Sequence, residues 1–159
     1  MYCYITPVLL VVLAAGCSGL KPYRTHGQNN LVILTSTDSG SVFTGIKSAV
    51  DIHHIDSDCN TEYQGTIKLD RSRLETGIHT NTPVQLIFVF ESNTWLAGTS
   101  SSISYNTLLD ARPGYRYEAK VSYRDDFYDV SLTAYPPHRA PVEKIQRTPL
   151  SACMTAAKQ

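Results

Sequence analysis

The densest group of residues able to do chemistry is the polar run at 53–62. Its oxygen-bearing side chains recur at every second position, as in the first half of a calcium-binding loop. They are Asp56, Asp58, Asn60 and Glu62. Such a loop also requires glycine at its sixth position and glutamate at its twelfth, where this chain has Thr61 and Ile67. We therefore interpret the run as a turn between strands and expect no calcium there.

The same run contains two adjacent histidines, His53 and His54. Neighbouring side chains of a strand point to opposite faces of the sheet, so these two cannot bind one metal ion together. Zinc would need distant partners such as His79 or His138, and no ligand spacing in the sequence supports that arrangement. The sequence therefore predicts no metal site and no cofactor.

Residue patterns typical of catalysis are absent from the sequence. There is no Gly-x-Ser-x-Gly elbow, no phosphate-binding loop and no dinucleotide fingerprint. Ser100 to Ser102 are interpreted as a flexible loop, so no catalytic residue is predicted and the protein is expected not to be an enzyme. The 14 basic and 14 acidic residues give a net charge of zero, which argues against a nucleic-acid partner.

Alternation of apolar and polar residues is the dominant pattern of the chain, and it predicts β-strands. Six strands are expected at 31–34, 50–54, 63–69, 84–90, 115–123 and 128–134, with a short edge strand within 142–147. The last two of the six are joined closely at 124–126, which predicts an antiparallel hairpin. Because no segment keeps a helical period, we expect an all-β fold, an antiparallel two-sheet β-sandwich of the immunoglobulin or transthyretin-like kind.

The N-terminus carries an apolar run over residues 5–15, which is too short to span a membrane and is typical of a signal peptide. The segment Leu13-Ala14-Ala15-Gly16-Cys17 resembles the lipobox of bacterial lipoproteins. That resemblance implies cleavage before Cys17, lipidation of Cys17, and anchoring in the cell outer membrane, facing the periplasm or the cell surface. The pattern departs from the family at Ala14, where a larger aliphatic residue is favoured, and in having no Lys or Arg before the apolar run. The alternatives are an ordinary secretory signal and a core strand with an incidental cysteine, and whether Met1 is the natural start stays open.

Roughly residues 31–135 resemble small proteobacterial lipoproteins of mostly unknown function. The resemblance rests on Cys59, the strand at 84–90, the serines at 100–104 and Pro113-Gly114-Tyr115-Arg116-Tyr117. It implies a compact β-sandwich and transfers no active-site residues to this chain. The expected organisation is a signal peptide at 1–16, a lipid-anchored flexible tether at 17–30, a sandwich domain at 31–153 and a frayed C-terminus at 154–159.

Four cysteines are present, and the resemblance leaves two of them for the folded domain. Cys3 leaves with the signal peptide and Cys17 receives the lipid. Cys59 and Cys153 then remain in an exported protein, where pairing is the default, so we predict a disulfide that holds the C-terminal segment against the domain. A redox role would require a Cys-x-x-Cys spacing, which the sequence lacks.

Aromatic residues are the remaining candidates for an interaction surface. Tyr115, Tyr117 and Tyr123 share one face of a predicted strand, and Trp95 lies in a predicted loop. The tyrosines are interpreted either as core residues or as a patch that binds a protein or glycan. The expected function is therefore that of a non-enzymatic envelope protein, an accessory or assembly component that contacts an unknown envelope protein. The alternative is a module that binds a glycan or a small ligand.

Overall fold

A computed structural model describes residues 20–37, 44–94, 99–124, 127–138 and 140–156. Within these ranges the chain forms β-strands and one short helix. They are β1 (Leu31–Thr37), β2 (Thr44–Ile55), β3 (Thr61–Lys68), β4 (Arg73–Thr76), β5 (Pro83–Thr94), β6 (Thr99–Asp110), β7 (Arg116–Arg124), β8 (Phe127–Tyr135), β9 (Glu143–Ile145) and α1 (Ser151–Ala156). The predicted signal peptide, Cys17 and Trp95 lie outside the described residues.

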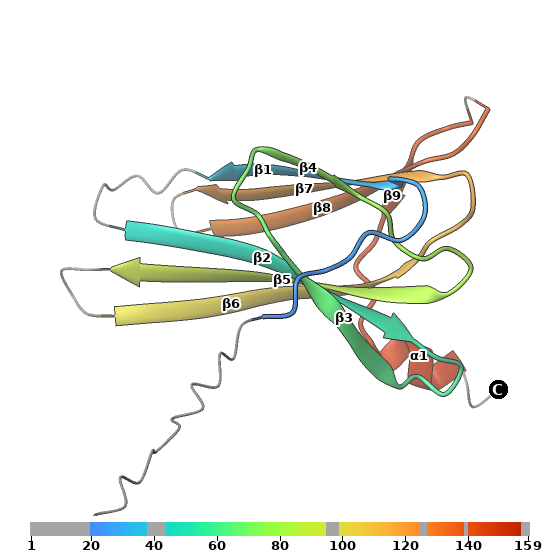
Figure 1. Ribbon diagram of the computed structural model, residues 1–159, viewed down its shortest axis with the longest axis horizontal. Coiled ribbons are helices and arrows are strands. Elements are labelled where there is room, and N and C mark those ends of the chain that lie inside the picture. The colour runs from blue at the N-terminus through green and yellow to red at the C-terminus, as the bar shows by residue number, and fades with distance from the viewer. Residues whose placement is uncertain (1–19, 38–43, 95–98, 125–126, 139, 157–159) are drawn as a thin grey trace, which may run out of the picture.

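The strands form two sheets that pack face to face (Figure 1). A five-stranded sheet has the order β4-β1-β7-β8-β9, and a four-stranded sheet has the order β3-β2-β5-β6. The prediction of an all-β, two-sheet sandwich is confirmed. Antiparallel pairing was expected throughout, but β1 runs parallel to β7, from Leu31 beside Tyr117 to Thr37 beside Tyr123. This difference arises because the strand that follows β1 lies in the other sheet, so no hairpin joins β1 to its neighbours.

Strict alternation along the strands builds the core between the sheets. In β7, Tyr117, Ala119, Val121 and Tyr123 are buried, while residues between them face outward. β5 contributes its alternate apolar residues from the opposite sheet in the same way. The main cluster comprises Leu31, Ile33, Val50, Ile52, Leu69, Ile78, Val84, Leu86, Phe88, Phe90, Leu109, Ala111, Tyr117, Ala119, Val121, Val130, Leu132 and Ala134.

The serine-rich stretch at 100–104 lies in β6, so the interpretation of Ser100 to Ser102 as a flexible loop is wrong. β6 pairs with β5 along its whole length, from Thr94 beside Thr99 to Pro83 beside Asp110. Continuous pairing with a buried apolar strand outweighs the weak strand preference of serine. The short β4 was also not predicted from the sequence, because it has only four residues and too few apolar side chains to show an alternating pattern.

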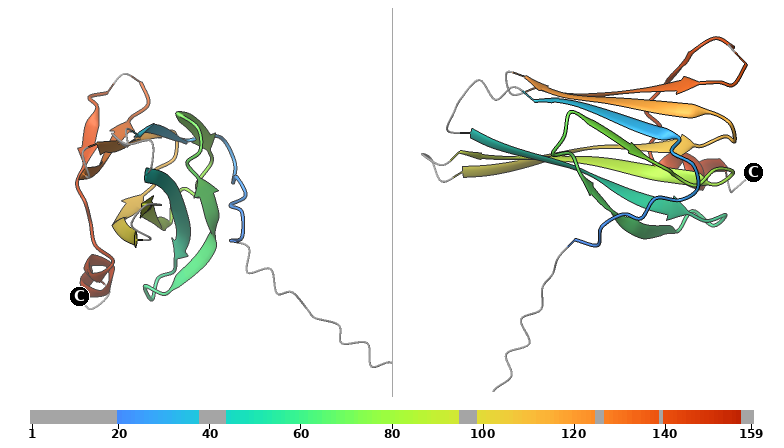
Figure 2. Two further views of the ribbon diagram at one scale, coloured as in Figure 1. Left: turned by 90° about the vertical axis from the view of Figure 1, so that its left-hand side faces the viewer. Right: turned by 45° about the horizontal axis from the view of Figure 1, so that its top comes forward.

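Residues 21–30, which we call the N-terminal strap, lie against the domain rather than forming part of a flexible tether. The Thr66 N–H donates to the carbonyl of Lys21 at 2.8 Å, and the Tyr23 N–H donates back to Thr66 at 3.0 Å. Further on, the His26 N–H donates to the carbonyl of Gly77, just after β4. The strap therefore crosses from the four-stranded to the five-stranded sheet and covers one side of the sandwich (Figure 2). The tether predicted at 17–30 is wrong for residues 21–30.

The opposite side of the sandwich is covered by the C-terminal segment. β9 pairs with β8 of the five-stranded sheet, and the Leu108 N–H of β6 then donates to the carbonyl of Thr148 at 2.8 Å. The chain ends in α1, where the predicted disulfide between Cys59 and Cys153 is confirmed, with 5.9 Å between the Cα atoms. Residues 154–156 belong to this helix, so the prediction of a frayed end from residue 154 is wrong for these three. Among the described residues, no helix has the length and apolar character to cross a membrane.

Candidate functional site

A groove of about 580 Å³ lies where the strap meets two loops, the one before β5 and the one before β7. We call it the strap groove. It is lined by His26, Gly27, Gln28, Asn29, Asn30, Ile78, His79, Thr80, Pro113, Gly114, Tyr115 and Arg116. Every one of these segments is irregular backbone next to a strand end, so the groove is built from loops held by the rigid sheets.

Asn30 fixes the floor of the strap groove. Its side-chain amide donates to the Ile78 carbonyl at 3.0 Å, and its side-chain oxygen accepts from the Ile78 N–H at 2.8 Å. The Asn30 backbone N–H donates to Thr76, and its carbonyl accepts from the Tyr117 N–H at 2.7 Å. The side-chain amide and the backbone groups of Asn30 therefore hold the fold together rather than bind a ligand.

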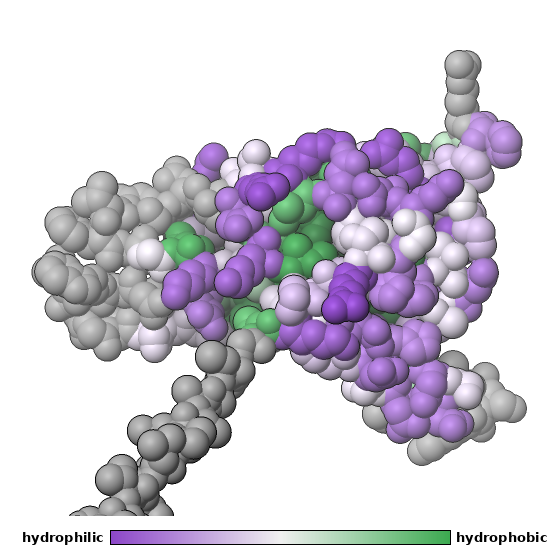
Figure 3. All heavy atoms as spheres, viewed as in Figure 1, coloured by the Kyte–Doolittle hydropathy of each residue, from purple (hydrophilic) through white to green (hydrophobic). Residues whose placement is uncertain are grey.

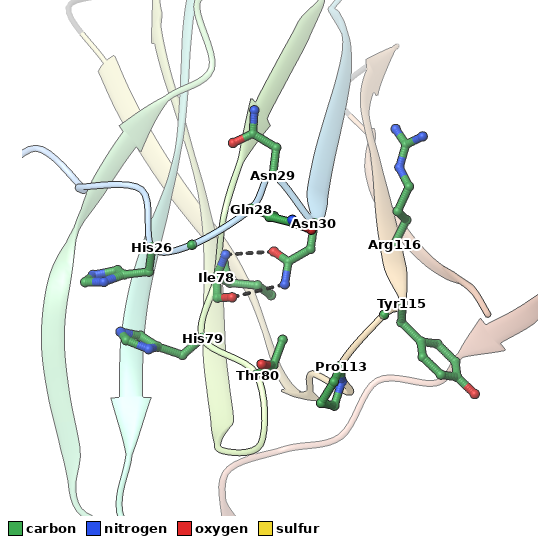
Figure 4. Close-up of a pocket in the computed structure, with 12 residues that line it drawn as sticks. His26, Gln28, Asn29, Asn30, Ile78, His79, Thr80, Pro113, Tyr115 and Arg116 are labelled. Atoms are coloured by element: carbon green, nitrogen blue, oxygen red, sulfur yellow. Dashed lines mark hydrogen bonds between the residues drawn. The ribbon is translucent and has the colours of Figure 1, made fainter. Parts of the chain in front are cut away.

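The side chains on the two walls of the groove point apart (Figure 4). His26 and His79 project together on one side, and Tyr115 and Arg116 project on the other. A small-molecule site usually brings a few polar groups together around the ligand. The strap groove offers the exposed amides of Gln28 and Asn29 at its rim, which suits weak recognition of a hydroxyl-rich ligand more than catalysis.

Three histidines come together beside the groove, although they lie far apart in the sequence. The rings of His26 and His79 are 4.0 Å apart between centroids and tilted by 33°, and His54 lies 6.0 Å from His79. Zinc binds a histidine nitrogen in the plane of the imidazole ring, so two rings that lie over each other in this way do not direct their nitrogens at one ion between them. In the part of the chain that the structure describes, no group of three His, Cys, Asp or Glu residues could hold a metal ion.

The electrostatics of the histidine cluster favour an uncharged His79 ring. Burial lowers the pKa of His79, and the neighbouring His26 and His54 lower it further. The His54 Nδ1 is buried and has no hydrogen-bond partner within the described structure. Sequence reasoning missed this cluster because His26 was placed in a tether. The prediction that His53 and His54 face opposite sides of the sheet is confirmed. The ring of His53 packs against the ring of Tyr63, with 5.3 Å between their centroids, and does not join the cluster.

The calcium-like run at 56–62 forms a turn whose polar groups hydrogen-bond to one another. The Asp56 carboxylate accepts from the backbone N–H groups of Asp58 at 2.9 Å and Asn60 at 2.8 Å, and from the Asn60 side-chain amide at 3.0 Å. The side-chain hydrogen bond from Asn60 is the largest of the effects that lower the pKa of Asp56. These donors hydrogen-bond to the Asp56 carboxylate oxygens that a cation would need as ligands. The turn instead positions Cys59, whose φ of 64° lies in the left-handed region, for its disulfide.

A hydroxyl–carboxylate chain lies on the outer face of the four-stranded sheet beneath the strap. The Thr66 hydroxyl donates to the Asp51 carboxylate, and the Tyr63 and Thr66 hydroxyls are 2.5 Å apart. A nucleophile needs both an adjacent base and access to substrate. Thr66 is only 6% exposed and its backbone is bonded to the strap, so this chain of groups secures the strap rather than performing catalysis.

The predicted tyrosine surface is largely internal. Tyr117 is 1% exposed and its hydroxyl accepts from the Arg112 N–H at 2.7 Å, and Tyr123 is 2% exposed beside Tyr128. Their assignment to an interaction surface is wrong, because the alternation of β7 turns both rings into the core. Tyr115 stays half-buried at the groove, with the Arg112 guanidinium 4.1 Å above its ring.

The surface of the sandwich carries few large apolar residues. On the face drawn in Figure 3, apolar side chains gather near the middle, between the two layers, and hydrophilic side chains surround them. Among the described residues, the large apolar side chains that are well exposed are Leu20, Ile103, Phe127, Tyr135 and Val142. Phe127 is the most exposed of them at 79%, which makes it the clearest candidate contact for a protein partner.

No protein-family model matches the sequence, and no curated protein matches it.

Proposed function

We propose that this protein is a lipid-anchored, non-enzymatic β-sandwich of the bacterial envelope that acts through contacts with another envelope protein. The observation that carries the proposal is the start of the strap directly after the lipobox-like segment. Lys21, four residues after Cys17, already bonds to β3. At about 3.5 Å per residue, the link from lipid to domain spans at most about 14 Å.

A link this short gives the anchor a defined consequence. A lipidated Cys17 would hold the β3 side of the sandwich near the bilayer, and the rest of the surface would face a partner. Several acyl chains on one residue anchor far more firmly than a single chain, which binds only marginally. No amphipathic helix or basic patch would then be required.

The disulfide supports export of the chain. Bonds between cysteines persist in the periplasm and outside the cell, and they are rare in the reducing cytosol. Cys59 and Cys153 meet with Cα atoms 5.9 Å apart, although 94 positions separate them in the sequence. A non-enzymatic role is supported by the groups described above, since the Thr66 and Tyr63 hydroxyls lie beneath the strap and the His26 and His79 rings pack on each other.

The anchor is tested by replacing Cys17. Cys17→Ala should move the protein from the membrane fraction to the soluble fraction of the producing bacterium, whereas the matched variant Cys3→Ala should stay with the membrane. Metabolic labelling with an alkyne-bearing fatty acid should mark the wild type and Cys3→Ala only. A Cys17→Ala protein that remains membrane-bound and labelled would refute the proposal.

The partner is tested by crosslinking in cells followed by mass spectrometry. Phe127→Ala removes the most exposed apolar side chain, and Val142→Ala removes another exposed one as a matched control. We expect one recurrent protein partner that is lost in Phe127→Ala and kept in Val142→Ala. Crosslinks only to abundant envelope proteins, unchanged by either variant, would contradict a role in assembly.

A second candidate is a binding module for a glycan or small ligand, favoured by the amide-lined rim of the strap groove. Gln28 and Asn29 would supply hydrogen bonds to hydroxyl groups. Saturation-transfer NMR with fragments of envelope glycans should give signals that Asn29→Ala weakens. The absence of any transfer across such a panel would exclude this candidate.

A further inference from the structure

The two sheets have exposed edges, and most of these are protected against pairing with another strand. β4 is four residues long and carries an ion pair between Arg73 and Glu75, and β9 has only three residues, two of them charged. Short strands and charged side chains are the usual ways to keep an edge from pairing. The strap covers β3 at Thr66.

β6 is protected along only half of its length. The C-terminal segment covers its second half, where the Leu108 N–H donates to Thr148 and the Asn106 carbonyl accepts from the Arg147 side chain at 3.1 Å. Among the described residues, no hydrogen bond to a further strand or segment covers the first half, at 100–104. That half is also uncharged, because residues 99–109 contain no Asp, Glu, Lys or Arg.

The pairing pattern identifies which backbone groups of this half point outward. In an antiparallel ladder the N–H and C=O of one residue point to the same side, and the side alternates along the strand. Leu108 and Asn106 use their outward groups on the C-terminal segment, and the register with β5 continues without a shift to Thr99. The N–H and C=O of the even-numbered residues Ser100, Ser102 and Ser104 therefore point away from β5.

We propose that this edge binds a second copy of the same chain, as an antiparallel β6–β6 pair with its two-fold axis at Ser102. In that register Ser102 faces the partner's Ser102, and Ser100 faces the partner's Ser104. Each facing pair exchanges N–H···O=C bonds in both directions. Shifting the axis by one residue toward the C-terminus would require Asn106, whose carbonyl is already bonded to Arg147. The axis at Ser102 engages only outward groups that the C-terminal segment leaves uncovered.

A second copy suits this edge for two reasons. Two copies of an uncharged strand can pair without charge repulsion, whereas like charges that face each other across a pair destabilise it. Ile103 is 52% exposed although its neighbours of the same parity, Tyr105 and Thr107, face inward. In the proposed pair the two copies of Ile103 lie diagonally on one face, close enough for long side chains to touch. This pairing would cover an apolar side chain that a single copy leaves exposed.

Site-directed crosslinking tests the register. In a full-length chain with Cys3 and Cys17 replaced by serine, Ser102→Cys should place two thiols on the axis, with Cα atoms about 5.5 Å apart. Ser101→Cys is the matched control, because its Cα atoms would lie about 7–8 Å apart, too far for a disulfide. Mild oxidation of the purified proteins should give about tenfold more dimer for Ser102→Cys. Equal crosslinking of both variants, or of neither, would overturn the proposal.

Sedimentation of the same background chain provides an independent test. Ser102→Pro removes an outward N–H and costs no bond to β5. Its melting temperature should therefore match that of the wild type at concentrations low enough for both to be monomeric, while the dimer is lost at higher concentration. Ser102→Glu places two negative charges on the axis and should also give a monomer, whereas Ser131→Glu on exposed β8 should remain dimeric. A dimer that survives Ser102→Pro, or a wild-type chain that is monomeric at millimolar concentration, would contradict the pairing. These tests do not involve the membrane anchor, so their failure and the failure of the proposed function are distinguishable.

Discussion

The imidazole ring of His26 lies over that of His79, with 4.0 Å between the ring centroids. One ring belongs to the strap and the other to the connection between β4 and β5. The stack joins segments that are distant in sequence, next to the hydrogen bond from the His26 N–H to Gly77. Burial and the two neighbouring histidines lower the pKa of His79, so we expect the attachment of the strap to depend on pH.

The first prediction is that acid loosens the strap. The folded-state pKa of His79 is lowered, chiefly by burial, so on acidification the unfolded chain takes up the proton first. The stabilisation is present above the ordinary histidine pKa of about 6.5 and is lost as the pH falls through the folded-state pKa. Urea unfolding at about pH 7.5 and about pH 5 should show this loss, and His79→Gln should reduce it. His138→Asn serves as the control, and equal pH dependence in wild type and His79→Gln would contradict the prediction.

The second prediction concerns the alkaline side. Burial raises the pKa of Tyr23 to about 12, and its hydroxyl donates to the Gly77 carbonyl at 2.9 Å. The folded-state pKa is above the unfolded value, so this stabilisation is complete below about pH 10 and is lost as the pH rises through about 12. Tyr23→Phe should lower the free energy of unfolding by about 1 kcal/mol at neutral pH. Absorbance titration should lose a phenolate transition near pH 12 in Tyr23→Phe and keep it in Tyr135→Phe.

The third prediction tests the close approach of the strap to the β4–β5 connection. A Cβ atom added at Gly77 would collide with the carbonyl oxygen of His26 and lie 2.7 Å from that of Gln28. These are backbone atoms that cannot rotate away, so Gly77→Ala should destabilise the fold by about 1–3 kcal/mol. Gly45→Ala is the matched control, since nothing lies within 4 Å of its added Cβ. Similar urea midpoints for the two variants would show that the strap is not closely seated.

The fourth prediction concerns the disulfide. The bond between Cys59 and Cys153 spans 94 positions, and in the chain-entropy model a loop of this size stabilises the fold by about 4–5 kcal/mol. Cys59→Ser, Cys153→Ser and the double variant should all lose this amount in urea unfolding. Reductant should bring the wild type to the same midpoint. A double variant much less stable than either single one would indicate that the thiols contribute separately from their bond.

Alternation of residue types was enough to predict the sandwich and most of its strands. The β7 and β8 hairpin follows directly from residues of strict period two, because each buried side chain there is flanked by polar ones. β6 was not predicted, because its first half is rich in serine. Its strand conformation depends on pairing with β5 rather than on its own composition. The parallel contact of β1 with β7 is a property of chain topology that local pattern does not contain.

The histidine cluster and the strap groove could not be predicted, because both depend on where an irregular segment docks. Residues 21–30 lack periodicity, and their attachment rests on single contacts such as those of Asn30 and Tyr23. Tyr117 shows the opposite case. Its position in an alternating strand indicated that its side chain is buried, and it is buried. The residue pattern contained nothing from which the alternative, a role at the surface, could be judged.

The disulfide also decides how the chain would respond to a pulling force applied at its two ends. Tension would pass from residue 59 to residue 153 through the covalent bond, so the 94 intervening steps carry no load. At about 3.5 Å per residue, roughly 330 Å of contour length is thereby withheld from extension. Among the described residues, those that can lengthen are the ones outside this loop, chiefly the strap, β1, β2 and the last residues of α1. Most of β1's resistance would come from sliding along its parallel neighbour β7, where seven residue pairs shear together rather than opening one at a time.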